Sequence, residues 1–263
     1  MFRAALGVSA ARAAVLITKP AGWERSSYDG SAVSLFGGLY AATGALVGGL
    51  RANKVGFAAT CAVISGAVAG GIDDHLEDSF PAKGKGFAGH IGALRAGKVT
   101  SGLMKIGTIG TGAAISAAAL RSGAKHSSVL GWLADTALIA GSANLINLLD
   151  LRPGRALKAS LAVSALLGVG GSGAAIARSL AATSVLCLPE DLMGRTMLGD
   201  LGANAVGAQL GTLLAVRATP VKLAALSAVL GLTALSEKVS FSEVIETTPV
   251  LREIDALGRS IAS

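Results

Sequence analysis

The stretch from residue 144 to residue 158 combines amides, a carboxylate and cations at the end of an apolar segment. Asn144, Asn147 and Asp150 recur every third residue, so a helix would place them along one side. A Pro-Gly break follows, with three cations around it, Arg152, Arg155 and Lys158. Amide and carboxylate oxygens can hold a metal ion, and cations pair with phosphate, so we interpret the stretch as a site for an anionic ligand.

Two further acidic motifs could serve the same ligand. Asp73 and Asp74 follow eighteen uncharged residues, so at least one of them is expected at the edge of a membrane. We interpret this pair as metal-binding or catalytic, with solvation in an ordinary loop as the alternative. Asp200 follows a glycine and precedes Leu201-Gly202, where glycine lets the backbone approach a ligand closely. Two more cations lie in the segment after Asp74, Lys98 and Lys105.

The composition predicts that membrane helices hold these groups. Of the 263 residues, 52% are hydrophobic and only 15% are charged, and the mean hydropathy is +0.62. A soluble domain carries roughly 25% charged residues. The net charge of +7 could suggest a nucleic-acid partner, but the basic residues are scattered between apolar segments. Cytoplasmic loops of membrane proteins carry an excess of Lys and Arg, which explains this scatter. We therefore expect no nucleic-acid partner.

Apolar runs recur along the whole chain and predict an all-α polytopic membrane bundle of about nine transmembrane segments. Several runs are shorter than the roughly 20 residues of a straight span, so some helices are expected to be short or broken. We expect residues 1–236 to form the membrane domain and residues 237–263 a cytoplasmic amphipathic tail. The runs lie at about 4–18, 32–50, 55–72, 101–120, 128–149, 158–170, 172–188, 202–218 and 221–236.

Pairs of glycines four residues apart predict close helix packing. Small residues at this spacing let membrane helices approach each other, and we prefer packing to a phosphate-binding role. The pairs are Gly44/Gly48, Gly66/Gly70 and Gly207/Gly211. The sequence leaves open whether the chain forms a homodimer.

The acidic residues predict one functional face of the membrane. If the segments 19–31, 73–100, 150–158, 189–201 and the tail from 237 share a side, that side holds 15 of the 16 acidic residues and, counting Lys105 as well, 14 of the 23 Lys and Arg. The positive bias identifies this side as cytoplasmic. We expect the membrane to be the plasma membrane. Asp135 is the exception, within an apolar run, and is either functional or the structural partner of a buried cation such as Arg178.

The acidic motifs, their order and the topology around them resemble the polyprenyl-phosphate N-acetylhexosamine-1-phosphate transferases. This family includes the lipid I synthase of peptidoglycan assembly and the initiators of teichoic acid and O-antigen synthesis. The resemblance implies transfer of a sugar-1-phosphate from a UDP-sugar to polyprenyl phosphate, with release of UMP and a need for Mg²⁺. It further implies Asp200 as principal metal ligand and Asp73 and Asp74 at the metal and the lipid phosphate, one of them as a candidate base. Asn147 and Asp150 would lie at the nucleotide sugar.

The chain departs from the family pattern at two motifs. The family usually continues with Asp-Gly-x-Asp-Gly where this chain has Asp150-Leu-Arg-Pro153-Gly, and its Gly-Asp-x-Gly motif is followed here by Ala203 instead of serine. A His-rich cytoplasmic loop is missing from the sequence as well, and these departures argue against lipid I synthesis. They leave two alternatives to the transferase, a non-catalytic member that binds polyprenyl phosphate or scaffolds envelope assembly, and a transporter.

Overall fold

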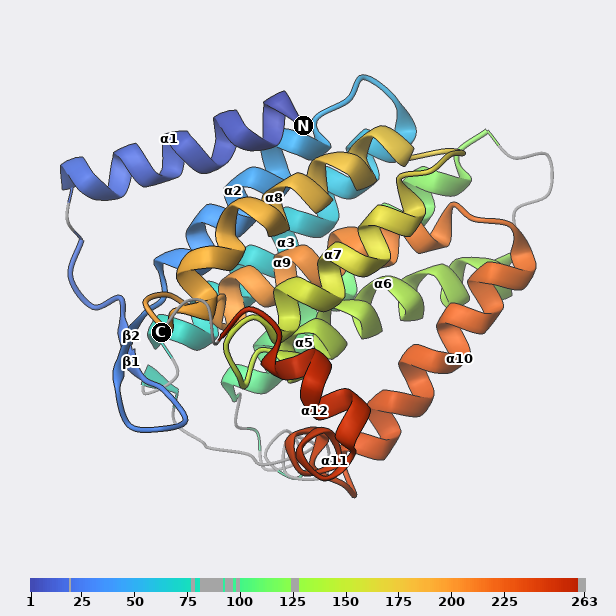
Figure 1. The fold of residues 1–263 in the computed structure, drawn as a ribbon. Coiled ribbons are helices and arrows are strands. Elements are labelled where there is room, and N and C mark those ends of the chain that lie inside the picture. Colours follow the sequence, from blue (N-terminus) through green and yellow to red (C-terminus); the bar gives the residue numbers. More distant parts are fainter. Residues whose placement is uncertain are drawn as a thin grey trace.

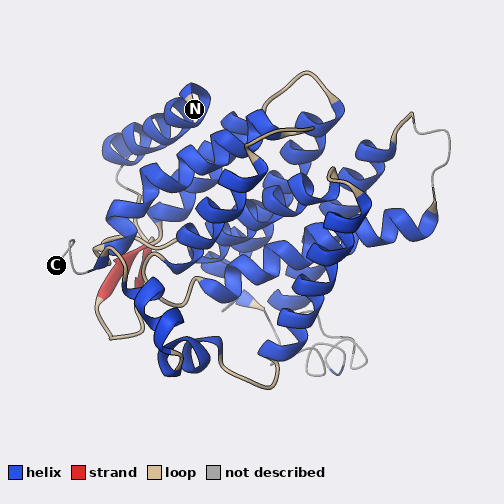
Figure 2. Cartoon of the chain, turned by 45° about the vertical axis from the view of Figure 1, so that its right-hand side comes forward, coloured by secondary structure: helices blue, strands red, loops and turns tan. Residues whose placement is uncertain are grey.

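The chain folds into a helical bundle with one small β-hairpin (Figures 1 and 2). The computed structural model describes residues 1–18, 20–76, 79–80, 92, 97, 100–123 and 128–259. Its helices in chain order are α1 (Phe2–Thr18), α2 (Phe36–Gly49), α3 (Lys54–Leu76), α5 (Ser101–Arg121), α6 (Val129–Leu149), α7 (Arg155–Leu167), α8 (Ala174–Leu192), α9 (Gly199–Ala215), α10 (Thr219–Ser236), α11 (Phe241–Thr247) and α12 (Pro249–Ala256). The hairpin pairs β1 (Glu24–Ser26) with β2 (Ala32–Ser34).

Each of the nine predicted apolar runs corresponds to one helix, so the all-α prediction is confirmed for the described residues. Four of these helices, α3, α5, α6 and α10, are long and apolar enough to cross a membrane. The count of about nine spans is not confirmed. At 14 and 13 residues, α2 and α7 rise only about 20 Å, whereas a bilayer core is about 30 Å thick.

Helix α9 lies at the centre of the bundle, and almost all of its residues are buried (Figure 1). It packs on α3 through the predicted glycine pair. A Cβ added at Gly66 would lie 2.6 Å from the Asn204 carbonyl oxygen, and one at Gly70 would overlap the Asp200 carbonyl. The backbone that carries Asp200 therefore rests directly on the backbone of α3.

The other glycine pairs also lie at helix contacts, as predicted. On α9, a Cβ at Gly211 would lie 2.6 Å from Ile139 Cα of α6, and one at Gly207 would overlap the Ser142 carbonyl. On α2, Gly44 faces α1 and α8, and a Cβ at Gly48 would lie 2.9 Å from Ser179 Cβ of α8. Packing therefore accounts for all three pairs.

Helix α10 carries an apolar surface that the described residues of the chain leave uncovered. Val229 is its single buried residue. Its exposed large apolar side chains are Val221, Leu223, Leu230, Leu232 and Leu235. An apolar helix with this exposure fits contact with lipid.

The described parts of the segments predicted to share one side of the membrane lie at one end of the bundle (Figure 1). The β-hairpin lies there, at the lower left of Figure 1. Ser34 of β2 bonds to the segment before α9, because its N–H donates to the Arg195 carbonyl at 3.1 Å and its carbonyl accepts from Met197 N–H at 2.9 Å. Trp23, directly before β1, stacks on Phe36 at the start of α2 with ring centroids 5.2 Å apart. The connecting segment 19–31 thus contains β1 and the turn of a hairpin that lies at this end of the bundle.

We expect Gly70→Ala to destabilise the bundle by about 1–3 kcal/mol, because the added methyl group would force α3 away from α9. Gly107→Ala is the control, since Gly107 is exposed on α5 and a Cβ there meets nothing within 4 Å. Thermal unfolding of detergent-solubilised protein measures both. Equal midpoints for the two variants would contradict the close α3–α9 contact.

Candidate functional site

Two of the three predicted acidic motifs meet through one lysine. Asp73 lies in the last turn of α3, Asp200 in the first turn of α9 and Lys105 near the start of α5. Lys105 Nζ lies 3.3 Å from Asp73 Oδ2 and 3.0 Å from Asp200 Oδ2. Residues far apart in the sequence therefore form a compact carboxylate pair with one cation.

Asp74 holds the beginning of α9. Its Oδ1 accepts from Asp200 N–H at 3.1 Å, and its Oδ2 accepts from Leu201 N–H at 2.8 Å. The first N–H groups of a helix lack partners within the helix, so Asp74 serves as their acceptor. Gly199 has a φ of +58°, and a Cβ there would lie 2.8 Å from Leu35 Cδ2, so glycine is required at this position.

Asp150 bonds to the same helix start from the other side. Its Oδ2 accepts from Gly199 N–H at 2.8 Å, and its side chain is buried. Burial raises the pKa of Asp150 well above its ordinary value of 3.8, and the neighbouring charge of Asp191 raises it further. The hydrogen bond from Gly199 acts in the opposite direction.

A cavity of about 310 Å³ joins these groups, and we call it the acidic cavity. Asn147 lines it, as the helix-face prediction requires, and so does Arg25 of β1, which the sequence did not identify. Arg25 Nη2 donates to the Asp74 carbonyl oxygen. The polar residues that line it are Arg25, Ser26, Asp73, Asp74, Asn147, Asp150 and Asp200.

Asn144 faces a different cavity. It lines a space of about 490 Å³ together with Asp73, Lys105 and apolar side chains of α5. Asp73 borders both this space and the acidic cavity, so the carboxylate pair lies between them.

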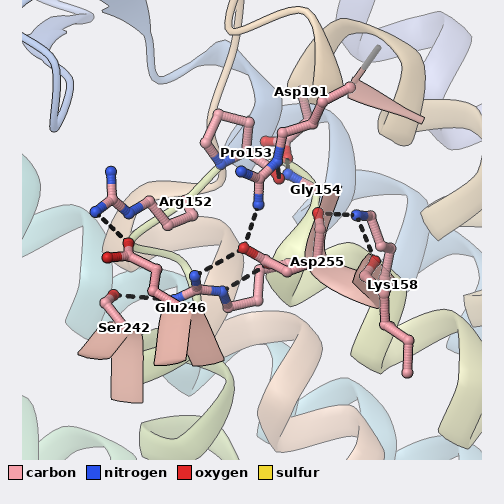
Figure 3. Close-up of polar contacts among 11 residues, drawn as sticks. Arg152, Pro153, Gly154, Lys158, Asp191, Ser242, Glu246 and Asp255 are labelled. Atoms are coloured by element: carbon pink, nitrogen blue, oxygen red, sulfur yellow. Dashed lines mark hydrogen bonds and ion pairs between the residues drawn. The ribbon is translucent and has the colours of Figure 1, made fainter. Parts of the chain in front are cut away.

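Three of the predicted cations, Arg152, Arg155 and Lys158, are bonded to the tail that follows α10 (Figure 3). Arg155 pairs with Asp255, Arg152 with Glu246, and Lys158 Nζ donates to tail carbonyls. Lys98 lies outside the described residues. Substrate binding by these four cations stays a prediction, and of Arg152, Arg155 and Lys158 only Arg152 lines a cavity that adjoins the acidic one.

Asp191 is an acidic residue to which the sequence assigned no role. It lies at the end of α8 with 3% exposure, and its Oδ2 accepts from Gly154 N–H at 2.5 Å. Gly154 has a φ of +77°, so Asp191 holds a left-handed turn in the loop that follows Asp150. Its place at the end of an apolar run, like that of Asp73, is the sequence signal that could have found it.

The donor chemistry of the carboxylate pair fits Mg²⁺. In the part of the chain that the structure describes, no group of three or more His, Cys, Asp or Glu is arranged to hold a metal ion. Mg²⁺ is commonly held by one or two carboxylates together with water and substrate phosphates. Asp73 and Asp200 supply two such carboxylates, whereas both oxygens of Asp74 already accept backbone hydrogen bonds.

Asp135 is separate from this site and has two partners. It is 2% exposed, and its carboxylate lies 2.8 Å from Arg121 Nε and 2.9 Å from Lys222 Nζ. The proposed partner Arg178 instead donates to the Gly168 carbonyl at 2.7 Å. Asp135 thus joins the ends of α5, α6 and α10, and it lines neither cavity described above.

Comparisons of the chain with protein-family models and with the sequences of curated proteins find no match.

The raised pKa of Asp150 predicts how stability depends on pH. Its stabilising contribution is complete below the ordinary carboxyl pKa and is lost as the pH rises through the raised pKa of the folded state. Between about pH 5 and pH 8, Asp150→Asn should therefore lose less stability than the wild type, because Asn stays neutral. Thermal unfolding across this range measures the difference.

Asp29→Asn is the control for this series. Hydrogen bonds from Ser27 and Ser31 lower the pKa of Asp29 to about 2, so Asp29 is ionised throughout this pH range. Its replacement should therefore not alter the slope of stability against pH. An Asp150→Asn slope equal to that of the wild type would contradict the assignment.

The contacts of Asp135 predict a structural role. We expect Asp135→Asn to lower the free energy of unfolding by about 3 kcal/mol, because it leaves two largely buried cations without a counter-charge. Ligand binding at the acidic cavity should be retained in the fraction that folds. Loss of binding at unchanged stability would indicate a functional Asp135.

Proposed function

We propose that the chain transfers a sugar-1-phosphate, with N-acetylhexosamine-1-phosphate as the first candidate, from a UDP-sugar to polyprenyl phosphate at a membrane, with release of UMP. The observation that carries the proposal is the meeting of Asp73, Asp200 and Lys105 beside the cavity that Asn147 and Asp150 line. This arrangement offers carboxylates for a divalent ion and a cation for phosphate at the end of an apolar bundle. The order of the motifs along the chain supports the same reaction.

The reaction joins two anions that repel each other. An oxygen of polyprenyl phosphate attacks the sugar-bearing phosphorus of the UDP-sugar, and the bond from that phosphorus to the oxygen bridging the two phosphates breaks as UMP leaves. Mg²⁺ supplies charge neutralisation when bound, and Asp73 and Asp200 are the residues that would hold it. Lys105 would pair with phosphate oxygens, and it already lies between the two carboxylates, 3.3 Å from Asp73 Oδ2 and 3.0 Å from Asp200 Oδ2.

In this proposal the other two acids, Asp74 and Asp150, hold the start of α9 in place. Asp74 fixes the first turn of α9 and thereby the backbone of Asp200, so its predicted part in metal binding becomes indirect. Asp150 bonds to Gly199 from the opposite side, and Asn147 beside it faces the nucleotide sugar.

The setting proposed for this reaction is the cytoplasmic face of the plasma membrane. The five further apolar helices of residues 1–236 would complete the membrane domain around the four candidate spans. Acidic and basic connecting segments gather at the same end as the acidic cavity, which supports a cytoplasmic site.

A non-catalytic member that binds polyprenyl phosphate is the second candidate, and one contact favours it. Lys105 already neutralises part of the charge of Asp73 and Asp200, so the carboxylate pair is stable without a metal. A transporter is less supported, because Asp135 is paired with Arg121 and Lys222 and lies away from the acidic cavity.

UMP release by purified protein with UDP-GlcNAc, polyprenyl phosphate and Mg²⁺ tests the proposal. We expect Asp200→Asn to lower kcat by at least about 100-fold, since the charge that holds the divalent ion is lost. Glu253→Gln is the control, because Glu253 is exposed on α12 away from the cavity. Full turnover by Asp200→Asn would refute the assignment, and polyprenyl phosphate binding without UMP release from any UDP-sugar would support the non-catalytic candidate.

A further inference from the structure

The end of the bundle opposite the β-hairpin is basic (Figure 1). The chain turns there between α2 and α3, between α5 and α6, between α7 and α8 and between α9 and α10. The described segments at this end contain no Asp or Glu, and they are 1–5, 49–57, 119–123, 128–131, 166–174 and 215–222. Their cations are Arg3, Arg51, Lys54, Arg121, Arg217 and Lys222. This end of the bundle therefore carries an excess of positive charge.

Only two of these cations are neutralised by a carboxylate of the described residues. Asp135, which lies farther along α6, pairs with Arg121 and Lys222. In the part of the chain that the structure describes, the other four cations form no ion pair. Arg217, for example, donates to the backbone carbonyls of Leu167 and Gly170. Backbone carbonyls fix the position of a guanidinium but do not cancel its charge.

Arg3 and Arg51 lie side by side although they carry like charges. The Nη1 of each donates to the Leu50 carbonyl, in the case of Arg51 at 2.8 Å. Partial burial lowers the pKa of Arg51, and the neighbouring charge of Arg3 lowers it further. An anion bound beside them would offset this repulsion.

Arg51 and Lys54 line an open space of about 570 Å³ between the start of α3 and the end of α5, which we call the basic cleft. Among the described residues, its lining holds these two cations and no carboxylate. The remaining lining residues are Ala52, Asn53, Phe57, Ala119 and Ser122. The charges of the basic cleft therefore favour an anion, and Phe57 gives it an apolar side.

The basic cleft lies where two candidate membrane spans end. Helix α3 begins at Lys54 and α5 ends at Arg121. At 23 and 21 residues they rise about 30–35 Å, which matches a hydrocarbon core of about 30 Å. Their ends are therefore expected at the level of the lipid headgroups. Phe57 lies one turn farther into α3 and is 56% exposed, so its ring faces the hydrocarbon side of this level.

We propose that the basic cleft binds an anionic phospholipid, with Arg51 and Lys54 at the headgroup phosphate and Phe57 against an acyl chain. A free phosphate ion would meet the two cations but would leave Phe57 without a partner, which favours the lipid. The bound lipid belongs to the leaflet opposite the acidic cavity. The site is separate from the proposed transferase site and does not depend on that function.

Calorimetric titration of the full chain in detergent with dihexanoyl phosphatidylglycerol tests the proposal. The double variant Arg51→Gln/Lys54→Gln should bind this lipid at least about tenfold more weakly, because two cations near an anionic headgroup are lost. Lys238→Gln/Arg252→Gln is the matched control, since it removes the same charge from two exposed residues that do not line the basic cleft. Equal affinity of the two double variants would refute the proposal.

Phe57→Ala separates a lipid site from a site for any phosphate. It should weaken binding of dihexanoyl phosphatidylglycerol and leave the weaker binding of inorganic phosphate unchanged. If the wild type binds inorganic phosphate as tightly as the lipid, or if Phe57→Ala binds the lipid as tightly as the wild type, the lipid assignment is wrong.

Dihexanoyl phosphatidylcholine tests the role of charge. Its headgroup carries a choline cation beside the phosphate, so the wild type should bind it more weakly than phosphatidylglycerol of the same chain length. Equal affinity for the two lipids would contradict the charge argument.

Thermal unfolding reports whether each variant is folded and gives a second measure of binding. A ligand that binds only the folded state stabilises it, so phosphatidylglycerol should raise the unfolding midpoint of the wild type more than that of Arg51→Gln/Lys54→Gln. Lys54→Gln alone changes one exposed side chain and should show part of the same loss if the double variant does not fold. An equal rise in the wild type and Lys54→Gln would remove Lys54 from the site.

Discussion

The first turn of α9 depends on carboxylates that other helices supply. Its N–H groups at Gly199, Asp200 and Leu201 have no partners within the helix, and Asp150 and Asp74 accept all three. Gly199 is buried and Asp200 and Leu201 are partly buried, so these N–H groups need acceptors supplied by the protein. The position of Asp200, and with it the contact to Asp73 and Lys105, follows from this arrangement of three helices.

Close backbone packing keeps this arrangement rigid. Glycines of α3 allow its backbone to touch that of α9 at the level of Asp200 and Asn204. On the other side of α9, Gly207 and Gly211 do the same against α6, the helix that ends at Asp150. Because glycine has no side chain, α3 and α6 pack closely against α9. Asp74 of α3 and Asp150 at the end of α6 in turn accept hydrogen bonds from the first turn of α9.

The sequence predicted the helices and the gathering of the acids more fully than it predicted individual contacts. Apolar runs ending in Asp73 and Asp150 on one predicted side sufficed to place both at the same end of the bundle as Asp200. The number of spans is not confirmed, because apolar composition does not separate a short buried helix such as α2 from one that crosses lipid. The β-hairpin was missed because its strands have three residues each and little periodicity.

Contacts of the cations could not be read from the sequence. Arg155 and Asp255 are 100 residues apart, and charge type alone does not select Asp255 over a ligand phosphate as its partner. For Asp135, composition predicted a buried cation as one alternative but not that Arg121 and Lys222 would both supply it. Asp191 escaped notice because its role is to hold the turn at Gly154, which depends on the fold.

The hydrogen bonds of Asp74 also impose an order on biogenesis. Its backbone partners lie 126 and 127 residues later in the chain, so they do not yet exist when α3 emerges from the ribosome. During that interval Asp74 must be hydrated or protonated at the edge of the bilayer. The acceptors Asp74 and Asp150 are thus synthesised before the helix whose first N–H groups they accept.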